Sequence, residues 1–487
     1  MNGLAILIII LSYFSLLLLI SWIIGKRHSN DAAFYLGNKQ SPWYIVAIGM
    51  IGSSLSGVTF VSVTGMVRNF DMTYLQMVLG FLLGYAVIAF VLLPLYYRLN
   101  LTSIYGYLGE RIGKHAYKTG SSFFLLSRTI GAAARLYVAV MILQTYVFSA
   151  WNIPFAVTAA GFLGMIWLYT FRSGVRTIIW TDLLQTSCLL IALILIIGQV
   201  AGKMELNVAG MVDAIRENPH SRIFVFDDWI SKQHFVKQFL SGIFVTLAMT
   251  GVDQEMMQKN LSCKDLKSAQ KNVCWYSLAF LPVNFLFLCL GILLLLFSSQ
   301  NGIDLPPLSD DILPMLLTQS YFGNTALILF IIGIIAVTFA SADSALTGLT
   351  TSVCVDLLNT SRYSESKAKK MRIRVHLLIS VFFILIMLAF RAANNSSIID
   401  AIYMIASYTY GPLLGLFAFG LLTKKKTNDR WAPYICVLAP VICYALNYFC
   451  KQQFGYTFGY ETLIINAGLV VLGLCAAPPR TAKRAIN

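Results

Sequence analysis

The chain has 487 residues, of which 58% are hydrophobic and 12% are charged, and its formal net charge is +15. A water-soluble protein carries about 25% charged residues, so the excess of apolar side chains in this chain must face lipid. The positive charge does not indicate nucleic-acid binding, because the basic residues lie in short segments between apolar runs and form no basic and aromatic binding module.

Thirteen apolar runs follow one another along the chain, and as helices they suit a bilayer core about 30 Å thick. They lie near residues 3–25, 43–67, 73–97, 119–149, 153–171, 177–201, 233–257, 273–298, 321–358, 372–391, 397–421, 431–450 and 461–477. The first run lacks a positively charged segment before it, so we interpret it as a retained helix rather than a signal peptide. We therefore predict an all-α integral membrane protein of about 13 transmembrane helices, with residues 1–487 forming a single membrane transport domain.

The basic residues predict the orientation of these helices. Most of the 36 lysines and arginines lie in every second connecting segment, as the positive-inside rule requires of cytoplasmic loops. This pattern places the N-terminus outside and the C-terminus in the cytoplasm of a multi-pass protein of the cell (plasma or inner) membrane. The longest non-apolar stretch, residues 203–232, has room only for a short external helix.

The sequence contains no constellation typical of an enzyme. Its five histidines are not paired with a cysteine or an acid at a useful spacing, and its nine cysteines form no metal-binding pattern. We predict free thiols, no structural metal, no cofactor and no enzymatic activity.

The second apolar run is interrupted by small and polar residues. Residues 52–59 contain two glycines and four hydroxyl side chains, which weaken a helix at its middle. A break there frees backbone carbonyls, and carbonyls in a protein-lined cavity can coordinate a cation. The alternative is a small-residue face that packs against another helix.

Two aspartates lie inside apolar runs, where a charge costs about 2.5–3.5 kcal/mol on insertion scales. Asp182 follows Arg172 and Arg176 closely enough to be a structural carboxylate paired with one of them. Asp343 has no basic residue at the neighbouring helical positions. A bound cation or a proton is therefore the simplest partner that would neutralise its carboxylate.

Basic residues also enter or border these runs. Arg128 and Arg135 are seven residues apart and share one helix face. Arg135 falls near the membrane midplane, where it either neutralises a carboxylate such as Asp182 or binds an anionic substrate. The segment 253–261, DQEMMQKNL, is interpreted as a polar cytoplasmic exit that is structural or part of an inner gate.

Four motifs resemble the sodium:solute symporter family. They are SSLSGVTF (53–60), IIWTDLLQ (178–185), DQEMMQKNL (253–261) and the ninth-run block that ends at Val355-Asp356-Leu357. The resemblance extends from about Gly3 to Leu422 and implies a leucine-transporter-type core of two inverted five-helix repeats. The repeats would comprise residues 43–202 and 233–422, with an extra N-terminal helix in residues 1–27 and two C-terminal helices and a tail in residues 430–487.

The resemblance also implies which residues bind ions. The principal sodium site would use the carbonyls of Gly52, Leu55 and Val337 and the hydroxyl of Ser341. Family members usually carry a second hydroxyl where this chain has Ala340. A second ion site would use Asp182, Asp343 and Ser344. Because a carboxylate is a stronger ligand for a hard cation than a hydroxyl is, we hypothesise that Asp343 compensates for Ala340.

Substrate contacts implied by the resemblance are Ser56, Thr59, Gln76 or its neighbours, and Arg135. The sialic-acid branch of the family uses an arginine on the equivalent helix for a carboxylate. The predicted function is a sodium-coupled secondary active symporter that imports a small organic solute, such as a sugar acid or carboxylate, by alternating access. Its partners would be the solute, sodium and the lipid bilayer. The alternatives are a proton-coupled symporter of the same fold, or a channel or sensor derived from it.

Overall fold

The computed structural model describes residues 3–25, 31–55, 57–171, 174–319, 321–393 and 398–479. The regular structure of these residues is helical, apart from one isolated bridge between Ser41 and Cys263. The predicted all-α class is therefore confirmed. Helices suit a bilayer because their backbone polar groups are hydrogen-bonded within the same segment.

Eight helical segments of the described chain are long and apolar enough to cross a membrane. They are α1 (Gly3–Gly25), α6 with α7 (Tyr74–Val87 and Leu93–Arg98, joined by a π-helical turn), α9 (Lys114–Leu143), α11 (Val175–Lys203), α15 (Leu266–Gln300), α17 (Gly323–Ser352), α18 (Glu365–Ala393) and α20 (Ala432–Phe454). Three shorter apolar helices are α10 (Phe155–Thr170), α19 (Ile398–Leu422) and α21 (Glu461–Ala476). Each of these helices coincides with a predicted apolar run.

Two further apolar segments are bent pairs of helices. α3 (Trp43–Ser54) meets α4 (Gly57–Gly65) at 63°, and α13 (Phe235–Thr246) with its π-helical continuation meets α14 (Gln254–Leu261) at 68°. The first bend falls in the stretch that predicted a broken helix. The second bend falls at the end of the seventh apolar run, in the helix pair that opens the second repeat implied by the resemblance. Asp253 begins the new helix there, because its carboxylate accepts hydrogen bonds from the N–H groups of Glu255 and Met256.

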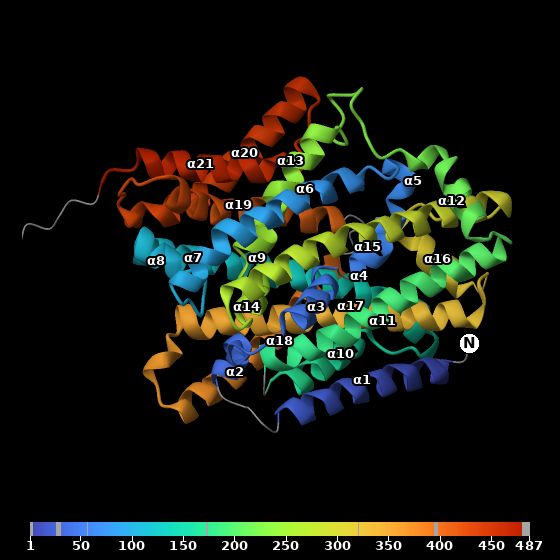
Figure 1. Cartoon of the computed structure of the whole chain (residues 1–487), viewed down its shortest axis with the longest axis horizontal. Coiled ribbons are helices and arrows are strands. Elements are labelled where there is room, and N and C mark those ends of the chain that lie inside the picture. Colours follow the sequence, from blue (N-terminus) through green and yellow to red (C-terminus); the bar gives the residue numbers. More distant parts are fainter. Residues whose placement is uncertain are drawn as a thin grey trace, which may run out of the picture.

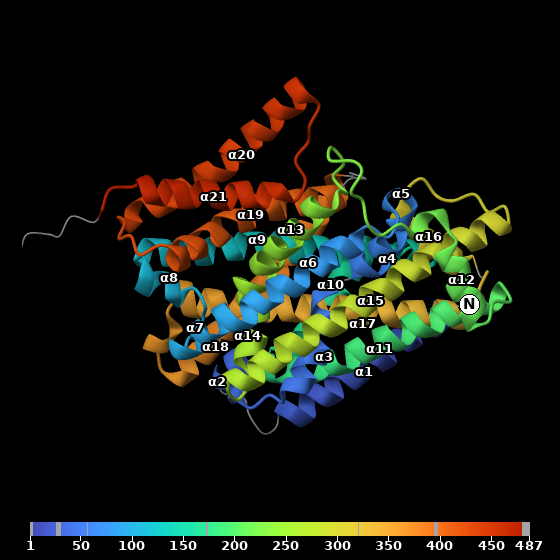
Figure 2. The same cartoon turned by 45° about the horizontal axis from the view of Figure 1, so that its top comes forward.

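Most of the long helices run along one common direction, and the short helices gather at the two ends of this bundle (Figures 1 and 2). α2 (Asp31–Leu36), α8 (Gly106–Arg111) and α14 lie toward one end. α5 (Val67–Phe70), α12 (Val208–Arg216) and α16 (Ile312–Thr318) lie toward the other. α12 confirms the short helix that was predicted within residues 203–232.

Burial separates a central helix from peripheral ones. Of the apolar window in α17, 78% is buried inside the bundle, whereas the corresponding share in α20 is 17%. α17 packs against α3, α4, α9, α11 and α14, so it passes through the centre of the protein. Peripheral helices expose large apolar side chains such as Leu378 and Leu438. These exposed side chains account for the apolar composition, because the surface they form suits lipid rather than water.

Candidate functional site

Glycines in the bent pair α3–α4 allow unusually close helix packing. A Cβ atom added at Gly49 would lie 2.8 Å from Cβ of Asp182 on α11, and one added at Gly57 would lie 2.8 Å from the hydroxyl of Thr338 on α17. The stretch is therefore both broken and a small-residue packing face, so the two interpretations of its sequence are compatible. Ser56, a predicted substrate contact, lies outside the described residues.

A lysine lies at the point where four helices meet. The ammonium of Lys259, on α14, donates hydrogen bonds to Oδ2 of Asp182 at 2.6 Å, to Oγ of Ser344 on α17 at 2.6 Å, and to Oγ of Ser53 on α3. Lys259 and Asp182 are both buried. A buried ion pair needs additional hydrogen bonds to offset its desolvation, and the two serines supply them.

Asp343 lies in the same cluster but has a different set of partners. Its Oδ2 accepts a hydrogen bond from the hydroxyl of Tyr169 at 2.8 Å, and its Oδ1 accepts one from Ser344 at 3.1 Å. Its side chain is fully buried. The cluster thus contains two carboxylates and one ammonium, and with all three groups ionised its formal charge is −1. One monovalent cation or one proton would neutralise it.

The structure corrects one interpretation of the sequence at this cluster and refines another. The segment 253–261, interpreted as a polar cytoplasmic exit that is structural or part of an inner gate, forms α14, which is buried over its whole length. Asp182 is paired with Lys259 rather than with Arg176 or Arg135, and Arg172 lies outside the described residues. The sequence did contain a signal for Lys259, since its segment is one of the four family motifs. Its depth, however, depends on the 68° bend before it.

Arg128 belongs to a second buried ion pair. Its Nε and Nη2 donate to the two carboxylate oxygens of Glu255, and its Nη1 lies 3.9 Å from Oδ2 of Asp253. The hydroxyl of Tyr410 donates to the same Asp253 oxygen at 2.9 Å. This bidentate arrangement joins α9, α14 and α19. It also neutralises the positive charge of Arg128 at the wall of the adjacent cavity.

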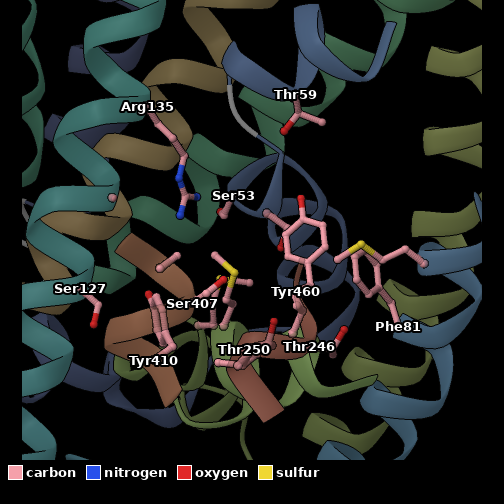
Figure 3. Close-up of a pocket in the computed structure, with 18 of the residues that line it drawn as sticks. Ser53, Thr59, Phe81, Ser127, Arg135, Thr246, Thr250, Ser407, Tyr410 and Tyr460 are labelled. Carbon is pink, nitrogen blue, oxygen red and sulfur yellow. The ribbon is translucent and has the colours of Figure 1, made fainter. Parts of the chain in front are cut away.

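That cavity has a volume of about 170 Å³ and lies between α3, α4, α6, α9, α13, α19 and α21. A cavity of about 150 Å³ is enough for a molecule such as benzene. Figure 3 shows Arg135 extending from α9 into the cavity, whose wall also includes Ser53. The polar residues of the wall are Ser53, Ser54, Thr59, Tyr74, Tyr85, Ser127, Arg128, Arg135, Thr246, Thr250, Ser407, Tyr410 and Tyr460.

Two predicted substrate contacts, Thr59 and Arg135, lie in this wall, but Gln76 does not. Gln76 is fully buried at the start of α6, where its amide donates to the carbonyls of Thr73 and Gln233 and accepts from the N–H of Val225. Its role is to hold the segment before α13 against α6. Its neighbours Tyr74 and Met77 do line the cavity, and the assignment of Gln76 or its neighbours as solute contacts stays a prediction.

The residues implied for the principal sodium site lie where the broken helix crosses α17. Leu55 ends α3 in an extended conformation, with φ −77° and ψ 157°. Gly57 begins α4 beside Thr338, which is adjacent to Val337 and three residues before Ser341. Gly52 packs against Thr186 on α11. The assignment of Gly52, Leu55, Val337 and Ser341 as ion ligands stays a prediction.

The sequence profile described as "Sodium:solute symporter family" matches residues 34–432. The chain belongs to this family. Among its relatives are a sodium/sialic acid symporter of Aliivibrio fischeri and a sodium-dependent multivitamin transporter of Oryctolagus cuniculus. The first is 22% identical and the match covers 97% of this chain and 92% of the relative; the second is 25% identical and the match covers 84% and 65%.

Solved structures of other symporters share the fold. A sodium-coupled sialic acid symporter in a substrate-bound outward-open state superposes with a TM-score of 0.82 at 19% identity, over 96% of both chains. A transporter of the nucleobase–cation symport-1 family in a closed conformation gives a TM-score of 0.57 at 10% identity, over 92% of this chain and 94% of the other. Membership of the sodium:solute symporter family makes this chain a multi-pass membrane transport protein rather than a member of an enzyme family.

Proposed function

We propose that the protein is a sodium-coupled secondary active symporter that imports a small anionic organic solute by alternating access. The observation that carries this proposal is the position of Ser53. Its side chain lines the solute cavity and also accepts a hydrogen bond from Lys259 within the buried charged cluster. An ion that enters the cluster and a solute that enters the cavity would therefore act on the same broken helix, as coupling requires.

The proposed architecture has thirteen transmembrane segments. The eight long segments, the two bent pairs and the three shorter apolar helices together reach that number. Each bent pair opens one proposed inverted repeat, in residues 43–202 and 233–422, with residues 1–27 before them and residues 430–487 after them. The N-terminus lies outside and the C-terminus in the cytoplasm, in agreement with the basic residues of the loops.

Arg135 is the proposed recognition group for the solute. Its guanidinium extends into the cavity (Figure 3), where its positive charge would attract an anion. A guanidinium binds a carboxylate through two parallel hydrogen bonds, and Thr59 and Ser407 lie in the same cavity wall. The names of the sialic acid symporters among the relatives support a sugar acid or another carboxylate.

The coupling ion is proposed to be sodium, bound near Asp343. A proton on Asp343 would neutralise the cluster equally well, so the test must separate the two ions. Uptake of radiolabelled carboxylates into proteoliposomes should follow an imposed sodium gradient at equal internal and external pH. Uptake driven by a pH gradient without sodium would instead assign a proton-coupled symporter. Equilibration without accumulation under either gradient would assign a channel.

A further inference from the structure

We propose that the ammonium of Lys259 acts as a permanent cation of the coupling site. It forms an ion pair with Asp182, so that Asp343 is the carboxylate that binds a mobile cation. The inference rests on the proposed sodium coupling and adds to it a count of ions. It predicts that this cluster takes one sodium ion although it contains two carboxylates.

The coordination of Lys259 supports this role. An ammonium has three donors and no acceptor, and here all three donors are used, on Ser53, Asp182 and Ser344. The contacts with Asp182 and Ser344 both measure 2.6 Å, at the upper end of the distances of about 2.3–2.6 Å at which oxygen ligands hold a hard cation such as Ca²⁺. The ammonium therefore fills the space between α3, α11 and α17 in which a mobile ion would otherwise bind Asp182.

Ser344 connects the two halves of the cluster. Its oxygen accepts from Lys259, and its hydroxyl proton is donated to Oδ1 of Asp343. Asp343 thus receives hydrogen bonds from two hydroxyls, Ser344 and Tyr169, and a cationic partner for it is not among these contacts. The negative charge that Lys259 leaves uncompensated is located at Asp343.

The other charged groups near the cluster have partners of their own. Glu255 lies close enough to influence Asp182 electrostatically, but its carboxylate is engaged at both oxygens by Arg128. Arg128, Asp253 and Glu255 form a separate network on the cavity side. The wild-type number of sodium ions at the cluster is therefore set by Lys259.

The test measures equilibrium binding of ²²Na⁺ to the purified full-length protein at fixed pH. Lys259→Met removes the ammonium and keeps most of the side-chain volume, and it should bind one more sodium ion per protein than the wild type. Lys259→Arg keeps the charge and should bind the wild-type number. The double variant Lys259→Met with Asp182→Asn removes both charges of the pair and should also return to the wild-type number. Lys259→Gln provides a second uncharged variant in case Lys259→Met does not purify as a folded protein.

The outcomes separate this inference from the function on which it rests. If the wild type binds sodium and both uncharged variants bind the same number of ions, Lys259 does not occupy a cation position and the inference is overturned. An additional ion that persists in the double variant also overturns it, since the ion would not lie at Asp182. If the wild type binds no sodium while it accumulates solute with protons, the sodium coupling and the ion count are both wrong.

Discussion

Replacement of Asp343 by asparagine tests the electrostatic basis of ion coupling. The substitution preserves the shape of the side chain and an oxygen that can accept the hydrogen bond of Tyr169, which measures 2.8 Å. It changes the formal charge of the cluster of Asp182, Lys259 and Asp343 from −1 to zero. The fold should therefore survive while the attraction for a cation is lost.

The size of the effect follows from Coulomb's law. One unit charge 4 Å from a cation contributes about 4 kcal/mol at an effective dielectric constant of about 20. Since about 1.4 kcal/mol corresponds to a factor of ten, the upper limit is roughly a thousandfold loss of sodium affinity. The asparagine oxygen retains part of the coordination, so we expect a loss of at least tenfold, as a rough lower bound.

The assay is the sodium dependence of solute uptake in proteoliposomes at constant pH, together with direct ²²Na⁺ binding. Asp356→Asn is the matched control, because Asp356 is another buried carboxylate, just beyond α17, that accepts hydrogen bonds from Tyr117 and Ser352 and lies outside the cluster. The control should leave sodium affinity unchanged. Unchanged sodium affinity in Asp343→Asn would refute the electrostatic role of Asp343 in sodium binding. If uptake by the variant no longer responds to a sodium or a pH gradient, the ²²Na⁺ binding measurement assigns the coupling ion.

Three further predictions follow from the site. Arg135→Gln should raise the KM for a carboxylate solute by about tenfold to a hundredfold, the loss expected for a charged hydrogen bond of about 1.5–3 kcal/mol; an equal rise in KM for a neutral solute would argue against anion recognition. Glu255→Gln should lower stability by about 3 kcal/mol because it leaves Arg128 poorly compensated, which a lower melting temperature in detergent would reveal, and an unchanged melting temperature would contradict it. Gly52→Ala should reduce uptake because the added methyl meets the Thr186 hydroxyl, and Thr186→Ala should restore part of the activity if this contact is the cause.

The residues of the cavity show how far patterns along the chain can identify a site. Thr59 and Arg135 were predicted as solute contacts, and both line the cavity; a polar group in an apolar run has a functional or structural partner. Gln76 has the same signature, but its partners are backbone groups of the segment before α13. Only the packing of that segment distinguishes a structural amide from a solute contact.

The sequence by itself determined the apolar segments, their helical structure and the break in the second of them. These features depend on local properties, namely the length of apolar runs, glycine and hydroxyl content, and the cost of exposed backbone in lipid. The tertiary structure alone decided which charges meet. Lys259 reaches Asp182 because α14 turns into the bundle by 68°, and an ion pair between residues far apart in the chain depends on helix packing that no local pattern encodes.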